Sequence, residues 1–274
     1  MDRRGFLGGS LAASWTLGAA MKNAEAAQGG GAGGGAAEAE REYYELRTYR
    51  LRIGPQKKAL DDFLREAAVP AWNRLGISPV GVFDTMLGPE SPSVHVLLCH
   101  KSAEALVTAG ERLASDAEFQ KAASSYMQRP AAEAPYIRYE SSLLRAFDKI
   151  PRLEVPASKG TEKPRIFELR IYESPNEVGH TKKIEMFTRL GELAIFRRTG
   201  LTPVFFGQTL VGSRLPNFVY MLTFESVEAR QKAWGVFVAD PEWKKVSSTP
   251  GYTDAEIMSG ITNVLLRPAP YSQV

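Results

Sequence analysis

The segment Glu45-Leu46-Arg47-Thr48-Tyr49 recurs as Glu168-Leu169-Arg170-Ile171-Tyr172, at an offset of 123 residues. Beyond this segment the offset becomes 124 and is kept over a long stretch of the chain. Further matched pairs include Gly76 and Gly200, Leu98 and Leu222, and Asp116 and Asp240. Matches that keep their order and nearly keep their register indicate an internal repeat. The chain therefore contains two homologous modules, which we place at residues 42–150 and 165–270.

Each module combines two kinds of hydrophobic pattern. Some segments alternate apolar and polar residues, as half-buried strands do, and others repeat apolar residues every three or four positions, as helices do. In the first module these patterns predict a strand at 43–51, a helix at 56–75, strands at 79–85 and 94–100, helices after Ser102 and Asp116, and a strand at 141–147. The order βαββαβ predicts an α+β fold in which both helical layers cover one face of a four-stranded antiparallel sheet, the ferredoxin-like arrangement.

Such a module leaves the second face of its sheet uncovered. Large exposed apolar faces are rare in soluble proteins, so that face needs a partner. Two modules in one chain supply that partner to each other. We therefore predict that the two sheets form a pseudo-dimeric α/β barrel within one chain, which makes the protein a monomeric pseudo-dimer. A homodimer through the same faces is the alternative.

Residues 1–26 have the layout of an export signal. A basic start with Arg3-Arg4 and Phe6-Leu7 precedes a weakly apolar stretch that ends in small residues near Ala24 and Ala26. The paired arginines resemble a twin-arginine signal, which predicts a periplasmic or other extracytoplasmic location. The apolar stretch falls short of the ~20 strongly apolar residues of a membrane span, so we expect no stable membrane insertion once the signal is removed. The alternatives are a retained anchor and an N-terminus that is not a signal at all.

Two further segments are predicted to be linkers. Residues 27–41 are rich in glycine and alanine, a composition typical of flexible tethers. Residues 151–164 are rich in proline and charge and separate the two modules.

Composition excludes several classes of function. The net charge is +3, and it falls to +2 without residues 1–26, which hold three basic and two acidic residues. So small a surplus gives no reason to expect a nucleic-acid partner. The single cysteine, Cys99, and the three histidines argue against a disulfide framework and a metal centre. Because nucleotide-binding motifs are also missing, we expect no metal and no cofactor.

Four short motifs of the first module resemble the NIPSNAP family. They are Tyr44–Tyr49, Gly54–Lys57, Pro70–Gly76 and Pro79–Phe83, and the second module keeps Phe167–Tyr172 and Gly200–Phe205. The resemblance covers both modules and implies a fold of the dimeric α/β-barrel superfamily. Relatives in that superfamily include cofactor-free monooxygenases, haem-dependent enzymes, dehydratases and ligand sensors, so the resemblance implies no particular reaction.

The first strand of each module carries the main candidate site residues. Alternation places Glu45, Arg47 and Tyr49 on one face of the first strand, and Glu168, Arg170 and Tyr172 on one face of its counterpart. Because Phe167, Leu169 and Ile171 form a fully apolar set, we expect that set to face the helices and the Glu-Arg-Tyr sets to face the barrel interior. These sets are then either buried ion pairs with a packed tyrosine or a ligand site. In a ligand site, the glutamates and arginines would bind the ligand and Tyr49 or Tyr172 would donate a proton.

His95 is the remaining candidate catalytic residue. His95 and His100 are five residues apart on a predicted strand, so they face opposite sides and cannot bind one metal ion together. The histidine pKa suits a general base, which makes His95 a candidate beside a structural role. Cys99 is expected to be a buried, inert thiol, and His180 is expected to be exposed.

These observations favour an exported NIPSNAP-like protein that binds a small organic ligand between sheet and helices, with its activity unassigned. One alternative is a cofactor-free enzyme of the monooxygenase or isomerase type, using His95 with Arg47 and Tyr49. Another is a non-catalytic assembly module with a filled barrel. Interior volume separates these possibilities, because small-molecule sites have cavities of about 300–1,000 Å³.

Overall fold

The computed structural model describes residues 40–157 and 165–274 of the chain. The predicted signal, residues 1–26, lies outside the described residues, as do residues 27–39 and 158–164 of the two predicted linkers. Within the described ranges, no helix combines the length and apolarity that crossing a membrane requires.

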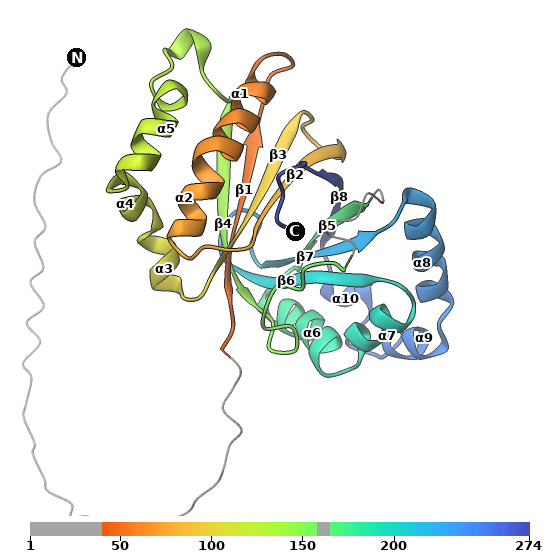
Figure 1. Ribbon diagram of the computed structural model, residues 1–274. Helices are drawn as coiled ribbons and strands as arrows, with labels where there is room; N and C mark the ends of the chain where they lie inside the picture. The colour runs from red at the N-terminus through yellow and green to blue at the C-terminus, as the bar shows by residue number, and fades with distance from the viewer. Residues whose placement is uncertain (1–39, 158–164) are drawn as a thin grey trace, which may run out of the picture. The chain divides into compact units, whose positions relative to one another are not determined.

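Eight strands close into one antiparallel barrel (Figure 1). They are β1 (Tyr43–Arg50), β2 (Val80–Leu87), β3 (Ser93–His100), β4 (Arg138–Ala146), β5 (Ile166–Glu173), β6 (Thr202–Val211), β7 (Asn217–Phe224) and β8 (Gly260–Pro268). Around the barrel the order is β1-β3-β2-β8-β5-β7-β6-β4. Each half therefore keeps its four strands together, and the halves join where β2 pairs with β8 and where β4 pairs with β6.

The helices lie on the outside of the barrel, those of each half against that half's strands (Figure 1). The first half has α1 (Gln56–Phe63), a π-helical turn (Leu64–Ala68), α2 (Val69–Arg74), α3 (Ala103–Val107), α4 (Ala109–Ala114), α5 (Ala117–Met127) and a 3₁₀ turn (Ala131–Glu133). The second half has α6 (Glu177–Thr188), α7 (Glu192–Arg198), α8 (Val227–Ala239), α9 (Pro241–Ser247) and α10 (Asp254–Ile257). This arrangement confirms the predicted pair of ferredoxin-like modules in a pseudo-dimeric α/β barrel.

Local signals in the sequence fix where several helices begin. The Ser102 hydroxyl accepts a hydrogen bond from the Ala105 amide, and the Asp116 carboxylate accepts one from Phe119. Asp240 does the same for Glu242 and Trp243, with Pro241 at the first helical position. Each cap satisfies backbone donors that have no partner inside their helix.

Three apolar clusters hold the structure together. One lies between the first sheet and its helices, one between the second sheet and its helices, and one fills the barrel interior. In the interior, Phe83 of the first half packs edge-on against Phe167 of the second, with ring centroids 4.9 Å apart. Gly81 leaves room for this contact, since a Cβ there would lie 2.6 Å from the Phe83 ring.

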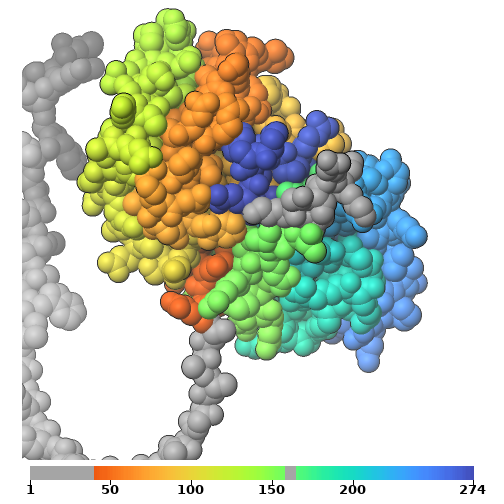
Figure 2. Space-filling model, in the orientation of Figure 1, coloured from red at the N-terminus to blue at the C-terminus, as the bar shows by residue number. Residues whose placement is uncertain are grey.

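The end of the chain completes the barrel wall. The Gln273 amide donates to the Val80 carbonyl, and the Val82 amide donates to the Ser272 hydroxyl, so the tail pairs with the part of β2 that β8 leaves uncovered. Figure 2 shows this tail, in dark blue, lying beside the first half. Although the tail follows β8 of the second module, it is therefore packed on the first.

Candidate functional site

The two faces of β1 and β5 are the reverse of our prediction. Leu46 and Leu169 belong to the cluster inside the barrel, whereas Tyr49 and Tyr172 belong to the clusters beneath the helices. The prediction placed the more apolar face of each strand against the helices. The inside of an eight-stranded barrel is itself filled by side chains, and here those of the described residues are mainly aliphatic and aromatic.

In the Glu45-Arg47-Tyr49 set, the charged groups are bonded to the protein's own side chains. The Arg47 guanidinium donates from Nε and Nη2 to the two Glu45 carboxylate oxygens, at 2.6 and 3.0 Å. The Ser141 hydroxyl also donates to Glu45, and Trp72 and Tyr139 lie against the Arg47 guanidinium. Burial alone would raise the pKa of Glu45, but the hydrogen bonds and charge of Arg47 lower it overall.

The Glu168-Arg170-Tyr172 set is enclosed more completely. Glu168 is fully buried and accepts hydrogen bonds from three groups, which are Arg170 Nη1 at 2.9 Å, Arg230 Nη2 at 2.5 Å and Trp234 Nε1 at 2.8 Å. Arg170 also donates to the Tyr172 hydroxyl. The expected ligand position between sheet and helices is thus occupied by the protein's own side chains.

A second buried ion pair adjoins this cluster. Lys183 Nζ lies 3.4 Å from the carboxylates of Glu192 and Asp254. Burial raises the pKa of Glu192 to about 7, against the opposing effect of Lys183. The offset of 124 places Ala59 and Ala68 at the equivalent positions of the first half, so this pair is specific to the second half.

A cavity of about 70 Å³, lined by both polar and apolar side chains, lies at one end of the barrel interior. Its floor is apolar and includes Leu46, Leu169, Val219 and Val264. The polar residues that line it are Thr48, Arg50, His95, Glu140, Ser142, Thr209, Ser213, Arg214, Asn217 and Thr262. Because both halves contribute to its lining, this barrel mouth exists only in the closed barrel.

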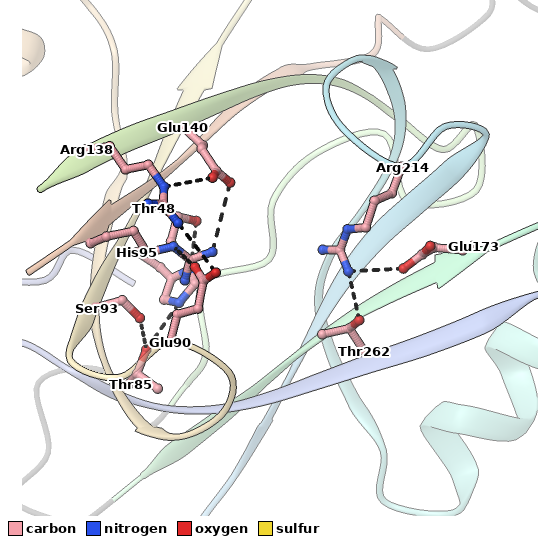
Figure 3. A network of polar contacts seen from close by, with 11 residues as sticks. Thr48, Thr85, Glu90, Ser93, His95, Arg138, Glu140, Glu173, Arg214 and Thr262 are labelled. Atoms are coloured by element: carbon pink, nitrogen blue, oxygen red, sulfur yellow. Dashed lines mark hydrogen bonds and ion pairs between the residues drawn. The ribbon is translucent and has the colours of Figure 1, made fainter.

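His95 lies on the inner face of β3 at the mouth. Its Nδ1 lies 3.2 Å from the Thr48 hydroxyl, and its Nε2 lies 3.2 Å from the Thr85 hydroxyl (Figure 3). Burial and the nearby Arg50 lower the pKa of His95 to about 4, so the imidazole is neutral near pH 7. Arg47 and Tyr49 lie on the opposite face of the sheet, so the structure does not bring these three residues together.

Ion pairs on opposite sides of the mouth come from the two halves. On one side Glu90 pairs with Arg50 at 2.5 Å and with Arg138 at 3.5 Å. On the other side Arg214 Nη1 donates to Glu173 and to the Thr262 hydroxyl, at 3.0 Å each. Figure 3 shows the two groups facing each other across the barrel end.

The other sequence candidates lie away from the mouth. His100 faces the helix side, 3.9 Å from the Glu45 carboxylate, which confirms that it is opposite to His95. Cys99 is a buried thiol, and burial raises its pKa, as expected of an inert cysteine. The expectation that His180 is exposed is wrong, because it lies on the buried side of α6 at 5% exposure, near the Phe218 ring.

Sequence reasoning missed Arg50, Glu90 and Arg214. The repeat offsets contain a usable signal, because Arg50 is equivalent to Glu173, and Glu90 is equivalent to Arg214. The Glu90–Arg50 ion pair of the first half therefore recurs in the second as Arg214–Glu173, with its charges exchanged. In the described ranges, no three metal-ligating side chains converge as a metal site requires.

A barrel closed by two sheets of one chain, with helices outside and a polar mouth, gives this protein the fold of the dimeric α/β-barrel proteins within a single chain. The family model for NIPSNAP matches residues 44–134 and 167–273, one segment in each half. The chain therefore belongs to the NIPSNAP family.

Solved structures resemble it over one half or over both. A protein from Lactobacillus acidophilus described as a "putative monooxygenase" covers 84% of this chain and 94% of its own, with 7% identity and a TM-score of 0.54. An uncharacterized NIPSNAP-like domain protein from Burkholderia xenovorans covers 41% of this chain and 92% of its own, with 25% identity and a TM-score of 0.36. At 7% identity the first likeness supports the fold and no activity. No curated protein sequence matches this chain.

Proposed function

We propose that this chain is an exported protein that binds a small organic ligand in the mouth of its barrel. The observation that carries the proposal is the cavity itself, in which an apolar floor lies below hydroxyl, amide and guanidinium groups from both halves. Binding sites for small molecules combine these two features. At about 70 Å³ the enclosed part lies below the roughly 300–1,000 Å³ of sites for drug-sized ligands, so it holds only a small group and the rest of the ligand extends toward solvent.

The geometry favours binding over catalysis. Both ring nitrogens of His95 already have threonine hydroxyl partners, and the imidazole lies apart from Arg47 and Tyr49. A general base needs a free acceptor within hydrogen-bond distance of its substrate. His95 therefore shapes the cavity and supplies one polar wall.

Filling the cavity is expected to weaken ligand binding. Thr262 lines the mouth, and its neighbour Asn263 is exposed on β8 outside that lining. With hits from a thermal-shift screen of small metabolites, Thr262→Trp should weaken binding at least about tenfold, as expected for loss of one or two contacts. Asn263→Trp carries the same bulk on the same strand and should bind within about twofold of the unmodified chain, the spread expected for a surface change.

Two results would contradict this proposal. If Thr262→Trp binds as well as Asn263→Trp, the ligand site lies elsewhere. If no metabolite binds the unmodified chain, the filled barrel is better explained as a non-catalytic assembly module.

Export depends on the two arginines at the start of the chain. Arg3-Arg4 with Phe6-Leu7 supports a twin-arginine route, which carries folded proteins and so suits a chain with one cysteine. In a bacterium with this route, Arg3→Lys with Arg4→Lys should retain the full chain in the cytoplasmic fraction. Replacing Lys22 by Arg is the matched control and should leave export unchanged. Equal export of both variants would contradict this route.

A further inference from the structure

The charged groups of the barrel mouth are balanced in number. Two guanidinium groups, those of Arg50 and Arg214, line the cavity together with one carboxylate, that of Glu140. His95 is neutral beside them near pH 7 because its pKa is lowered to about 4. Glu90 pairs with Arg50 and Arg138, and Glu173 pairs with Arg214, so with Glu140 the three arginines of the mouth face three carboxylates and the formal charges balance. The preference for an anionic group therefore depends on a guanidinium that keeps N–H groups for a further carboxylate.

Arg214 occupies an unusual backbone position at the tip of the β6–β7 hairpin. Its φ is +58°, and its equivalent Glu90, at the tip of the β2–β3 hairpin, has a φ of +56°. A residue with a Cβ is strained in this left-handed region, where glycine is not. Each tip nevertheless carries a charged side chain that binds back to its own half.

The Arg214 guanidinium is held on one side and available on the other. Nη1 makes both protein contacts, to Glu173 and Thr262. In the part of the chain that the structure describes, Nε and Nη2 donate no hydrogen bond. Those two N–H groups form the planar pair that binds the two oxygens of a carboxylate. Because Nη1 is held in place, the guanidinium can bind a carboxylate through its Nε–Nη2 edge.

The apolar floor of the cavity determines which chemical group the ligand carries beside its carboxylate. Leu46, Leu169, Val219 and Val264 line it, and they offer no polar partner. A cavity of about 70 Å³ is small beside the roughly 300–1,000 Å³ of sites for drug-sized ligands, so its floor suits a short alkyl group. Building on the proposed function, we infer that the ligand is a small aliphatic monocarboxylate, with its carboxylate on Arg214 and its alkyl group on the apolar floor.

The test compares three probes of one size, which are butyrate, butan-1-ol and butylammonium. Each is titrated into the ¹⁵N-labelled full chain, and the amide shifts of Thr48 and Thr262 report the mouth. Butyrate should give saturable shifts, with a Kd at least about tenfold below that of either other probe, since a charge-assisted contact is lost in both. Arg214→Gln should weaken butyrate by about tenfold on the same grounds. Arg197→Gln, an exposed arginine paired with Glu154 in the same half, makes the same charge change and should leave the Kd unchanged.

The failures of the two proposals are distinguishable. If butan-1-ol binds at the mouth as tightly as butyrate, or if Arg214→Gln binds butyrate like the unmodified chain, the carboxylate assignment is overturned and the mouth remains a ligand site. If none of the three probes moves the Thr48 and Thr262 amides while metabolites from the screen do, the aliphatic class is wrong. If neither probes nor metabolites move them, the proposed function is overturned as well.

Discussion

Replacing Phe167 by alanine is expected to lower the free energy of unfolding by about 3–5 kcal/mol, the cost of emptying a buried phenylalanine site. Phe167 is fully buried inside the barrel, and its ring meets Phe83 of the other half at 4.9 Å. Urea denaturation of the full chain measures the loss. A loss below about 1 kcal/mol, the range of surface substitutions, would place Phe167 outside the barrel interior.

A double-mutant cycle then shows whether the two halves meet in the barrel. Phe83→Leu and Phe167→Leu should be coupled by about 0.5–1.5 kcal/mol, the range for an aromatic pair. Phe83→Leu with Phe237→Leu is the control, because Phe237 belongs to the cluster beneath the helices of the second half. Those two changes should add within about 0.5 kcal/mol. Equal coupling in both cycles would contradict the contact across the halves.

Replacing Glu168 by leucine is expected to cost about 3–5 kcal/mol for a different reason, the loss of a buried ion-pair partner. Glu168 is fully buried, and its removal leaves the buried Arg170 without a carboxylate and the Trp234 ring N–H without an acceptor. Glu45→Leu is the matched change in the first half. Its partner Arg47 has a side chain 19% exposed to water, so the expected loss is smaller.

The same denaturation experiment separates a structural role from a ligand-binding role. A structural cluster predicts that Glu168→Leu lowers stability with no added ligand and does not alter the probe shifts at Thr48 and Thr262. If Glu168→Leu is as stable as Glu45→Leu, the three hydrogen bonds to Glu168 contribute little, and this cluster becomes a candidate site again.

The fold could be predicted because the internal repeat is visible in the order of residues along the chain. Matches such as Gly76 with Gly200 and Asp116 with Asp240 fix the same element order twice, and two incomplete sheets have few ways to cover each other. The prediction that successive side chains of β1 and β5 point to opposite faces of the sheet was also correct. The choice of face was wrong because both sides of this sheet are buried, so alternation alone does not say which side is the barrel interior.

The candidate site was harder to predict, for a related reason. Thr48 and His95 lie on paired positions of β1 and β3, a contact that depends on strand register. Arg50 and Arg214 reach the mouth from a strand end and from a hairpin tip, positions that hydrophobic patterns do not locate. Only the exchange of charges between equivalent positions, Arg50 with Glu173 and Glu90 with Arg214, is visible in the sequence, and it becomes meaningful once the barrel brings them to one end.

A crystal structure of the full chain soaked with butyrate tests most directly where a ligand is held. We predict density for butyrate between the Arg214 guanidinium and the apolar floor at Leu46 and Val264. Density between sheet and helices instead, beside Arg47 or Arg170 and with the cavity at the barrel end holding only water, would contradict the assignment of the mouth as the binding site.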